Sequence, residues 1–171
     1  EALLPYQAQW DALAGDCPMR SWAWLTTWWK HYGAPHQLYV LLVFADDPQP
    51  HCQTGSACKS DPQPAQLTAI LPCYLESHFA RGRVLRLLGD GEVCSDHLDL
   101  LAPAGLLEPV TQALAHTLND QLHDWDTTEF TAIAADSPGI LELTAALETL
   151  GCAVCRAPNQ SRWTIDLPAD W

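Results

Sequence analysis

The sequence predicts an α/β fold in which helices flank a mixed, largely antiparallel sheet. Segments with helical periodicity alternate with short apolar, β-branched runs, and no internal repeat interrupts this order. The chain has 171 residues, of which 48% are hydrophobic and 17% charged, so it can bury a core without disulfide or metal support. We therefore expect one folded domain over residues 1–171.

The first three elements are two helices and a strand. Residues 5–14 have apolar side chains at helical spacing, and Gly15 is a suitable stop. Residues 22–32 repeat this pattern after Ser21, which can cap the helix. The run QLYVLLVF at 37–44 is apolar and too short for a helix, which predicts a strand buried on both faces.

The middle of the chain predicts a loop followed by three strands. Residues 45–66 are rich in Asp, Pro, Gln and Ser, a composition typical of a mobile surface loop. Strand composition returns at 67–76, although Pro72 cannot donate a ladder hydrogen bond and so indicates an edge position or a bulge. Residues 83–88 and 97–101 then predict two strands of a meander.

The last third alternates helix and strand. Residues 106–122 carry leucine and valine on one stripe and form the clearest amphipathic helix. Residues 127–134 alternate as a strand does, and Ser137 followed by proline starts a helix over 138–150. Two extended segments complete the order, at 152–157 and 162–167.

The net charge of −13 excludes broad classes of partner. Nucleic acids and anionic membranes are bound through many Lys and Arg, and this chain has only eight. The longest apolar run, 38–45, is shorter than the roughly 18 residues of a membrane helix, and no basic and apolar leader opens the chain. We expect a cytoplasmic protein that does not bind nucleic acid or span a membrane.

The seven cysteines indicate reduced thiols rather than a disulfide framework, because their number is odd and the domain is large. Cys152 and Cys155 form a C-x-x-C, but in an extended segment residues three apart face opposite sides. A zinc site would need a second pair, and only Cys52 and Cys58, beside His51, are available. We expect no metal site.

Acid and base groups are densest between Asp90 and Asp99. Asp96 and His97 are the first candidates for a catalytic base, and Asp99 would share the face of His97 on a regular strand. The alternative is that these side chains form turns and bond to the backbone. A nucleophilic dyad of Cys94 and His97 is weaker, because nothing in the sequence identifies an orienting group.

Aromatic residues supply the candidate substrate contacts. Residues 22–29 hold four of the eight tryptophans, and Trp24 and Trp28 are candidates to line a ligand groove together with Tyr74 and Asp99. The alternative is that this helix packs against the sheet. Arginines 81, 83 and 86 form the one basic cluster, which we interpret as a solvated strand end.

Four stretches resemble the CelD-like acetyltransferases of the GNAT superfamily, named for cellulose biosynthesis. These stretches are 21–33, 69–75, 83–101 and 163–171, so the likeness covers nearly the whole chain except 45–66. The resemblance implies two tandem GNAT folds, related to Fem-type aminoacyl ligases, with this chain as the N-terminal half. The start at a residue other than Met and the end after a loop-like stretch agree with that expectation.

The resemblance also implies an activity, which is acyl-CoA-dependent transfer to an amine on a sugar, aminoacyl or envelope-related acceptor. A GNAT domain binds the coenzyme A pyrophosphate with a Q/R-x-x-G-x-G/A turn, and the sequence contains none. The nearest match, Gly89-Asp90-Gly91, carries negative charge. Acetyl-CoA or another acyl-CoA is thus expected to bind a second GNAT half or a homodimer partner, while this half shapes the acceptor site. The alternatives are a catalytically silent binding or dimerisation module and a lone GNAT domain that pairs with its own copy.

Overall fold

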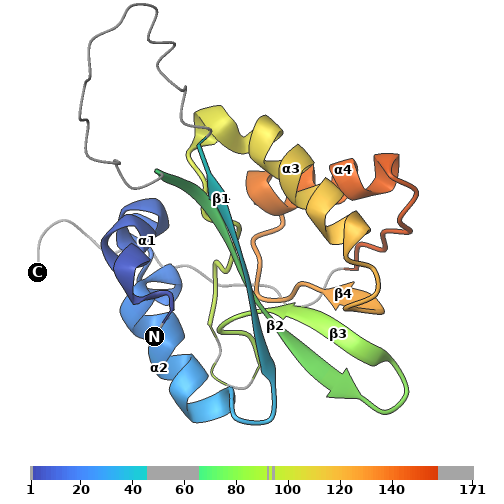
Figure 1. Ribbon diagram of the computed structural model, residues 1–171, viewed down its shortest axis with the longest axis horizontal. Coiled ribbons are helices and arrows are strands. Elements are labelled where there is room, and N and C mark those ends of the chain that lie inside the picture. The colour runs from blue at the N-terminus through green and yellow to red at the C-terminus, as the bar shows by residue number, and fades with distance from the viewer. Residues whose placement is uncertain (1, 46–65, 92, 94, 158–171) are drawn as a thin grey trace, which may run out of the picture.

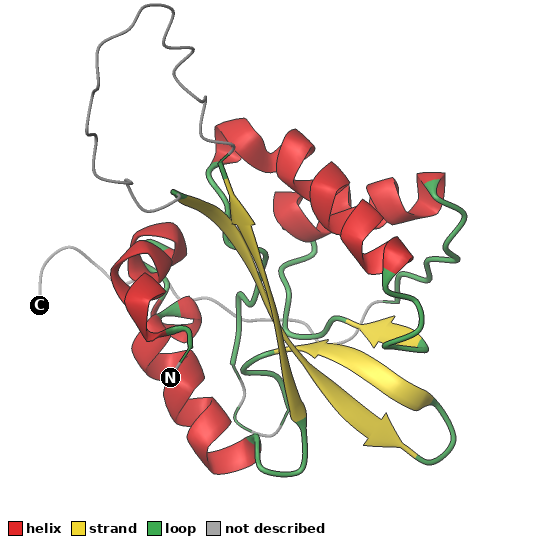
Figure 2. Cartoon of the chain, in the orientation of Figure 1, coloured by secondary structure: helices red, strands yellow, loops and turns green. Residues whose placement is uncertain are grey.

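The computed structural model describes residues 2–45, 66–91, 93 and 95–157, and it has helices on both faces of a four-stranded sheet (Figures 1 and 2). The pair α1 and α2 lies on one side of the sheet, and α3 and α4 lie on the other. The helices are α1 (Gln7–Ala14), α2 (Trp22–Tyr32), α3 (Leu107–Asp120) and α4 (Pro138–Thr149), with single 3-10 turns η1 (Leu4–Tyr6), η2 (Pro18–Arg20) and η3 (Ala104–Leu106). The strands are β1 (Gln37–Phe44), β2 (Leu67–His78), β3 (Gly82–Leu87) and β4 (Thr127–Glu129).

The sheet has the order β1-β2-β3-β4. β2 is antiparallel to both of its neighbours, β1 and β3, whereas β3 pairs with β4 in parallel. The predicted α/β class with a mixed, largely antiparallel sheet between helices is therefore confirmed at this level. The predicted loop at 45–66 lies outside the described residues except for its two ends. The predicted strand at 162–167 lies wholly outside them.

The helix ends follow the local signals of the sequence. The Ser21 hydroxyl accepts a hydrogen bond from the backbone N–H of Trp24 at 3.2 Å, which caps α2. Gly33 is the C-cap of α2, and only glycine fits there, because a Cβ at that position would lie 2.4 Å from the Trp29 ring. At the start of α4, the Ser137 hydroxyl accepts from the N–H of Ile140 at 3.4 Å.

Pro72 lies in an internal strand, so the prediction of an edge position or bulge was wrong. Its carbonyl accepts from the N–H of Leu88 at 2.9 Å, just beyond the last β2–β3 pair. Further along the same edge of β2, Ile70 exchanges two hydrogen bonds of 2.9 Å with Leu101. The missing proline donor thus falls where β2 changes its partner from β3 to the segment that ends at Leu101.

Two predicted strands are shorter or less regular than expected. Residues 97–101 form only the isolated bridge at Leu101, and β4 ends at Glu129 rather than 134. The reason is backbone conformation, because His97 and Ala132 have φ angles of 57° and 59°, in the left-handed region that breaks a strand. The two segments still touch, since the N–H of Leu98 donates to the carbonyl of Ala132 at 3.0 Å. Residues 152–157, also predicted as a strand, contain no regular structure.

The first helix holds the chain that leads into the candidate site. Trp10 is buried and its indole N–H donates to the carbonyl of Arg20 at 3.0 Å. The Asp11 carboxylate accepts from the N–H of Trp22 at 2.8 Å. These two contacts fix η2 against α1 and thereby set the position of Arg20.

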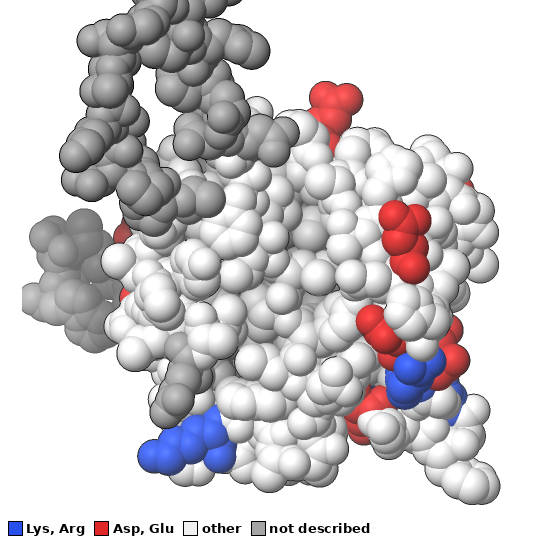
Figure 3. All heavy atoms as spheres, in the orientation of Figure 1, with Lys and Arg blue, Asp and Glu red and all other residues white. Residues whose placement is uncertain are grey.

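Charged side chains are unevenly distributed over the face seen in Figure 3. Few lie over β1 and the adjacent helices, whereas positive and negative groups gather near β3 and β4. Two ion pairs there join Arg81 to Glu129 and Arg83 to Asp126.

None of the helices in the described part of the chain has the length and apolar character needed to cross a membrane.

The left-handed backbone at Ala132 predicts a stabilising substitution. Ala132→Gly should raise the free energy of unfolding by about 0.5–1 kcal/mol, because glycine adopts this conformation without the Cβ penalty. Ala135→Gly is the matched control. Its φ is not positive, so the added chain entropy of the unfolded state should lower stability. Urea denaturation compares the variants, and equal losses in both would contradict the assignment of strain to residue 132.

Candidate functional site

An open pocket of about 560 Å³ lies where η2, the segment after His97 and the start of α4 meet. The pocket is lined by side chains from three parts of the chain that are distant in sequence. The lining residues with ionisable side chains are Asp16, Cys17, Arg20, His97, Asp99 and Asp136. The structure therefore brings two of the residues predicted from the sequence, His97 and Asp99, into one cavity with four that were not predicted.

Asp99 serves both the fold and the pocket. Its Oδ1 accepts hydrogen bonds from the Ser137 hydroxyl at 2.6 Å and from the N–H of Leu100 at 2.8 Å. Its Oδ2 lies 3.9 Å from Nη1 of Arg20. Burial raises the pKa of Asp99 above its ordinary value, and the hydrogen bonds and Arg20 oppose this shift only in part. Asp99 is thus a carboxylate with one oxygen used by the start of α4 and the other facing Arg20.

Arg20 is the one cation among the described residues that line the pocket. Asp99 is its charged partner there, at a distance too long for a hydrogen bond. The Nε of Arg20 is buried and has no hydrogen-bond partner among the described residues. Asp16 and Asp136 are exposed carboxylates of the same pocket, so at neutral pH its carboxylates outnumber its guanidinium.

His97 and Asp96 separate in the structure. His97 is exposed and lines the pocket, and its left-handed backbone costs roughly 1–3 kcal/mol, a strain often found at functional sites. Asp96 is not among the residues that line the pocket. Its backbone N–H points to the sulfur of Met19 at 2.8 Å instead. The predicted neighbouring pair is therefore not brought together in this cavity.

Two of the predicted aromatic contacts lie in the core. Trp28 is buried and its ring centroid is 5.2 Å from that of Tyr74, which is also buried. This placement fits the alternative in which α2 packs against the sheet. Trp24 is 38% exposed, and its indole N–H donates to the Ser95 hydroxyl at 3.0 Å. Trp24 therefore holds the loop that leads to His97 but does not line the pocket.

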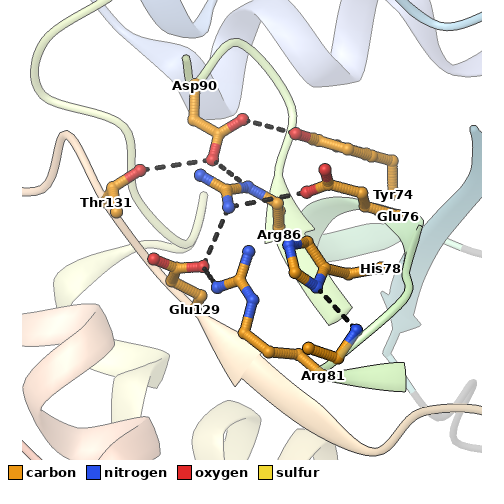
Figure 4. A network of polar contacts seen from close by, with 9 residues as sticks. Tyr74, Glu76, His78, Arg81, Arg86, Asp90, Glu129 and Thr131 are labelled. Carbon is orange, nitrogen blue, oxygen red and sulfur yellow. Dashed lines mark hydrogen bonds and ion pairs between the residues drawn. The ribbon is translucent and has the colours of Figure 1, made fainter. Parts of the chain in front are cut away.

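A buried polar network is centred on Asp90, just before the loop that leads to His97 (Figure 4). Asp90 is 1% exposed and accepts hydrogen bonds from the Tyr74 hydroxyl and from Nε of Arg86, both at 2.7 Å, and from Thr131 at 3.2 Å. Nη1 of Arg86 also contacts Glu129 at 2.9 Å and Glu76 at 3.5 Å. Burial and the Asp90 carboxylate raise the pKa of Tyr74 far above its ordinary value. The network fixes the inward orientation of the Gly89–Gly91 turn.

This network bears on whether the chain fits the coenzyme A pyrophosphate. The charged side chain of the Gly89–Gly91 turn is a carboxylate, and it is turned into the core. The arginines near the turn are already paired: Arg81 and Arg86 contact Glu129, and Arg83 contacts Asp126. The arginines described near this turn therefore offer a pyrophosphate no guanidinium that is not already paired with a carboxylate.

The cysteines add one group to the pocket. Cys17, Cys73, Cys152 and Cys155 are free thiols, and Cys17 is the one that lines the cavity. The described residues contain no group of three or more His, Cys, Asp or Glu that could hold a metal ion. The other pair considered for zinc, Cys52 and Cys58, and the proposed nucleophile Cys94 lie outside the described residues.

The buried network predicts a large difference between two carboxylate substitutions. Asp90→Asn should lower the free energy of unfolding by about 3 kcal/mol, because Arg86 loses its buried counter-charge. Glu148→Gln, the matched control, removes an exposed partner of Arg156 and should cost less than about 1 kcal/mol. Chemical denaturation measures both, and similar losses would show that the Asp90 contact does not stabilise the fold.

The pKa shift of Asp99 predicts how stability depends on pH. Because its folded pKa is raised above 3.8, Asp99 favours folding most below that value, and this contribution is lost as pH rises through the folded pKa. The stability of the wild type relative to Asp99→Asn should therefore fall from pH 3 upward. Asp126 has a lowered pKa, so the same comparison with Asp126→Asn should rise over the acidic range. Denaturation at a series of pH values measures both, and slopes of the same sign would contradict the assignment.

Comparison of the chain with family models, curated proteins and solved structures found no match. The resemblance to CelD-like acetyltransferases therefore stays a prediction from the sequence. What the structure establishes is an α/β domain whose mixed sheet lies between helices and whose pocket is lined by three carboxylates, an imidazole and a guanidinium.

Proposed function

We propose that this domain binds and deprotonates the amine acceptor of a GNAT-type N-acyltransferase. The observation that supports the proposal is the charge of the pocket. Among the described residues, Asp16, Asp99 and Asp136 line it together with the one guanidinium of Arg20. A primary amine with a pKa near that of lysine, about 10.4, is protonated at neutral pH, and a concave site with excess carboxylate attracts it.

The acceptor nitrogen must lose a proton before it can attack an acyl carbon. In the proposed reaction the nitrogen lone pair forms the new C–N bond, the carbon–sulfur bond of the thioester breaks, and the thiol leaves. The imidazole of His97, which lines the pocket, takes the proton from the ammonium group as the general base. Asp99 holds the ammonium group nearby, and burial makes its carboxylate a stronger proton acceptor than an exposed one.

The acyl donor belongs to another part of the assembly in this proposal. The arginines near the Gly89–Gly91 turn are all paired with carboxylates, which leaves the turn without a free guanidinium for a pyrophosphate. Acyl-CoA is then bound by a second GNAT half or by a partner copy, and the reaction takes place in the cytoplasm, where acyl-CoA is available. A catalytically silent binding module is the second candidate, and the pairing of these arginines favours it as well.

Kinetics of the complete gene product test the proposal. With acetyl-CoA and a panel of primary amines, the release of free thiol should depend on the amine. His97→Ala should lower kcat by roughly 10²-fold or more, through loss of the base. His116→Ala removes an exposed imidazole from α3 and should leave kcat unchanged.

Three other outcomes distinguish the candidates. Amine binding without thiol release would favour the silent module. Transfer by the isolated chain, with a rate that rises with its self-association, would favour a lone GNAT domain that pairs with its copy. Equal rates for His97→Ala and His116→Ala, in variants that fold normally, would remove His97 as the base.

A further inference from the structure

The charges that line the pocket are of both signs, and each sign has unused hydrogen-bonding capacity. Nη1 of Arg20 and Oδ2 of Asp99 lie 3.9 Å apart, beyond hydrogen-bond distance. A guanidinium carries five N–H donors, and the buried Nε of Arg20 has no hydrogen-bond partner among the described residues. The described residues thus leave both groups able to bind a further partner.

The position of Arg20 is set by the fold rather than by Asp99. Its backbone carbonyl is held by the Trp10 indole, and the η2 turn that contains it begins directly after Cys17. Asp99 is fixed separately, through Ser137 and the backbone of Leu100. Two independently held groups of opposite charge therefore line one cavity.

A ligand with a single charge satisfies only part of this arrangement. A simple amine leaves the guanidinium of Arg20 without a hydrogen-bonded anion. A simple carboxylate meets Arg20 but also faces Asp16, Asp99 and Asp136. A molecule with an ammonium and a carboxylate on neighbouring atoms can pair with both groups. Its carboxylate then contacts Arg20 and its ammonium contacts Asp99, so that each charge lies next to an opposite charge.

We infer that the pocket selects a zwitterionic acceptor of the α-amino acid class, with Arg20 bound to its carboxylate and the acidic side chains around its amine. This inference rests on the proposed acceptor role and adds the substrate class. The cavity of about 560 Å³ has room for such a molecule with a medium-sized side chain. Leu98, Pro18 and Pro138 supply apolar lining for that side chain.

Three probes with the same carbon branch test the inference by isothermal titration at pH 7. L-leucine carries both charges, isoamylamine lacks the carboxylate, and 4-methylpentanoate lacks the amine. Leucine should bind at least about tenfold more tightly than either of the others, the difference expected for one charge-assisted contact.

Variants assign the effect to Arg20. Arg20→Gln should lower the affinity for leucine to about that for isoamylamine and leave the affinity for isoamylamine unchanged or higher. Arg20→Lys keeps the charge but loses the planar fork, so an intermediate loss is expected. Arg156→Gln, on an exposed arginine outside the pocket, should change none of the affinities.

The outcomes separate this inference from the proposed function. If isoamylamine binds wild-type protein as tightly as leucine does, the carboxylate is not recognised and the inference fails, while the amine-binding role stands. If neither leucine nor isoamylamine binds, the acceptor role itself fails. If leucine is preferred but Arg20→Gln folds and keeps that preference, Arg20 is not the group that recognises the carboxylate and the inference is overturned. Should Arg20→Gln not fold, the comparison of the three probes on wild type and Arg20→Lys decides.

Discussion

The arrangement of the sheet and the pocket depends on the hydrogen bonds of the buried Asp90 carboxylate. It binds Tyr74 of β2, Arg86 of β3 and Thr131 beyond β4, so one side chain joins three neighbouring segments of the sheet. Such a carboxylate is tolerated in a core only when its charge is compensated and its oxygens are hydrogen-bonded. Here both conditions hold, and the chain leaves this point in the direction of His97 and the pocket.

Local signals in the sequence account for most of the helices and for the long strands. The caps at Ser21 and Ser137 act within one turn, so a single sequence shows them. The irregular part of the sheet follows from contacts between distant segments. The residues around Pro72 do not show that β2 changes its pairing partner there from β3 to Leu101. Likewise, the residues around Ala132 do not show that its backbone is left-handed.

The same distinction applies to the candidate site. His97 and Asp99 were found because acid and base groups are dense in one stretch of sequence, and both line the pocket. Arg20 and Asp136 were missed because neither stands in the stretch that is dense in acid and base groups, and each joins the others only when the fold brings the segments together. Trp28 and Tyr74 were placed in a groove by their aromatic character, which core and ligand contacts share.

The double use of Asp99 limits how this pocket can change. A Cβ added at Gly139 would lie 3.0 Å from its Oδ1 and 3.1 Å from the Cβ of Leu100, so the start of α4 and this carboxylate are packed against each other without spare room. Substitution of Asp99 therefore disturbs the start of α4 as well as the pocket. Asp16 and Asp136 are exposed and not part of that packing, which makes them the positions where the lining of the pocket can be varied while the scaffold is retained.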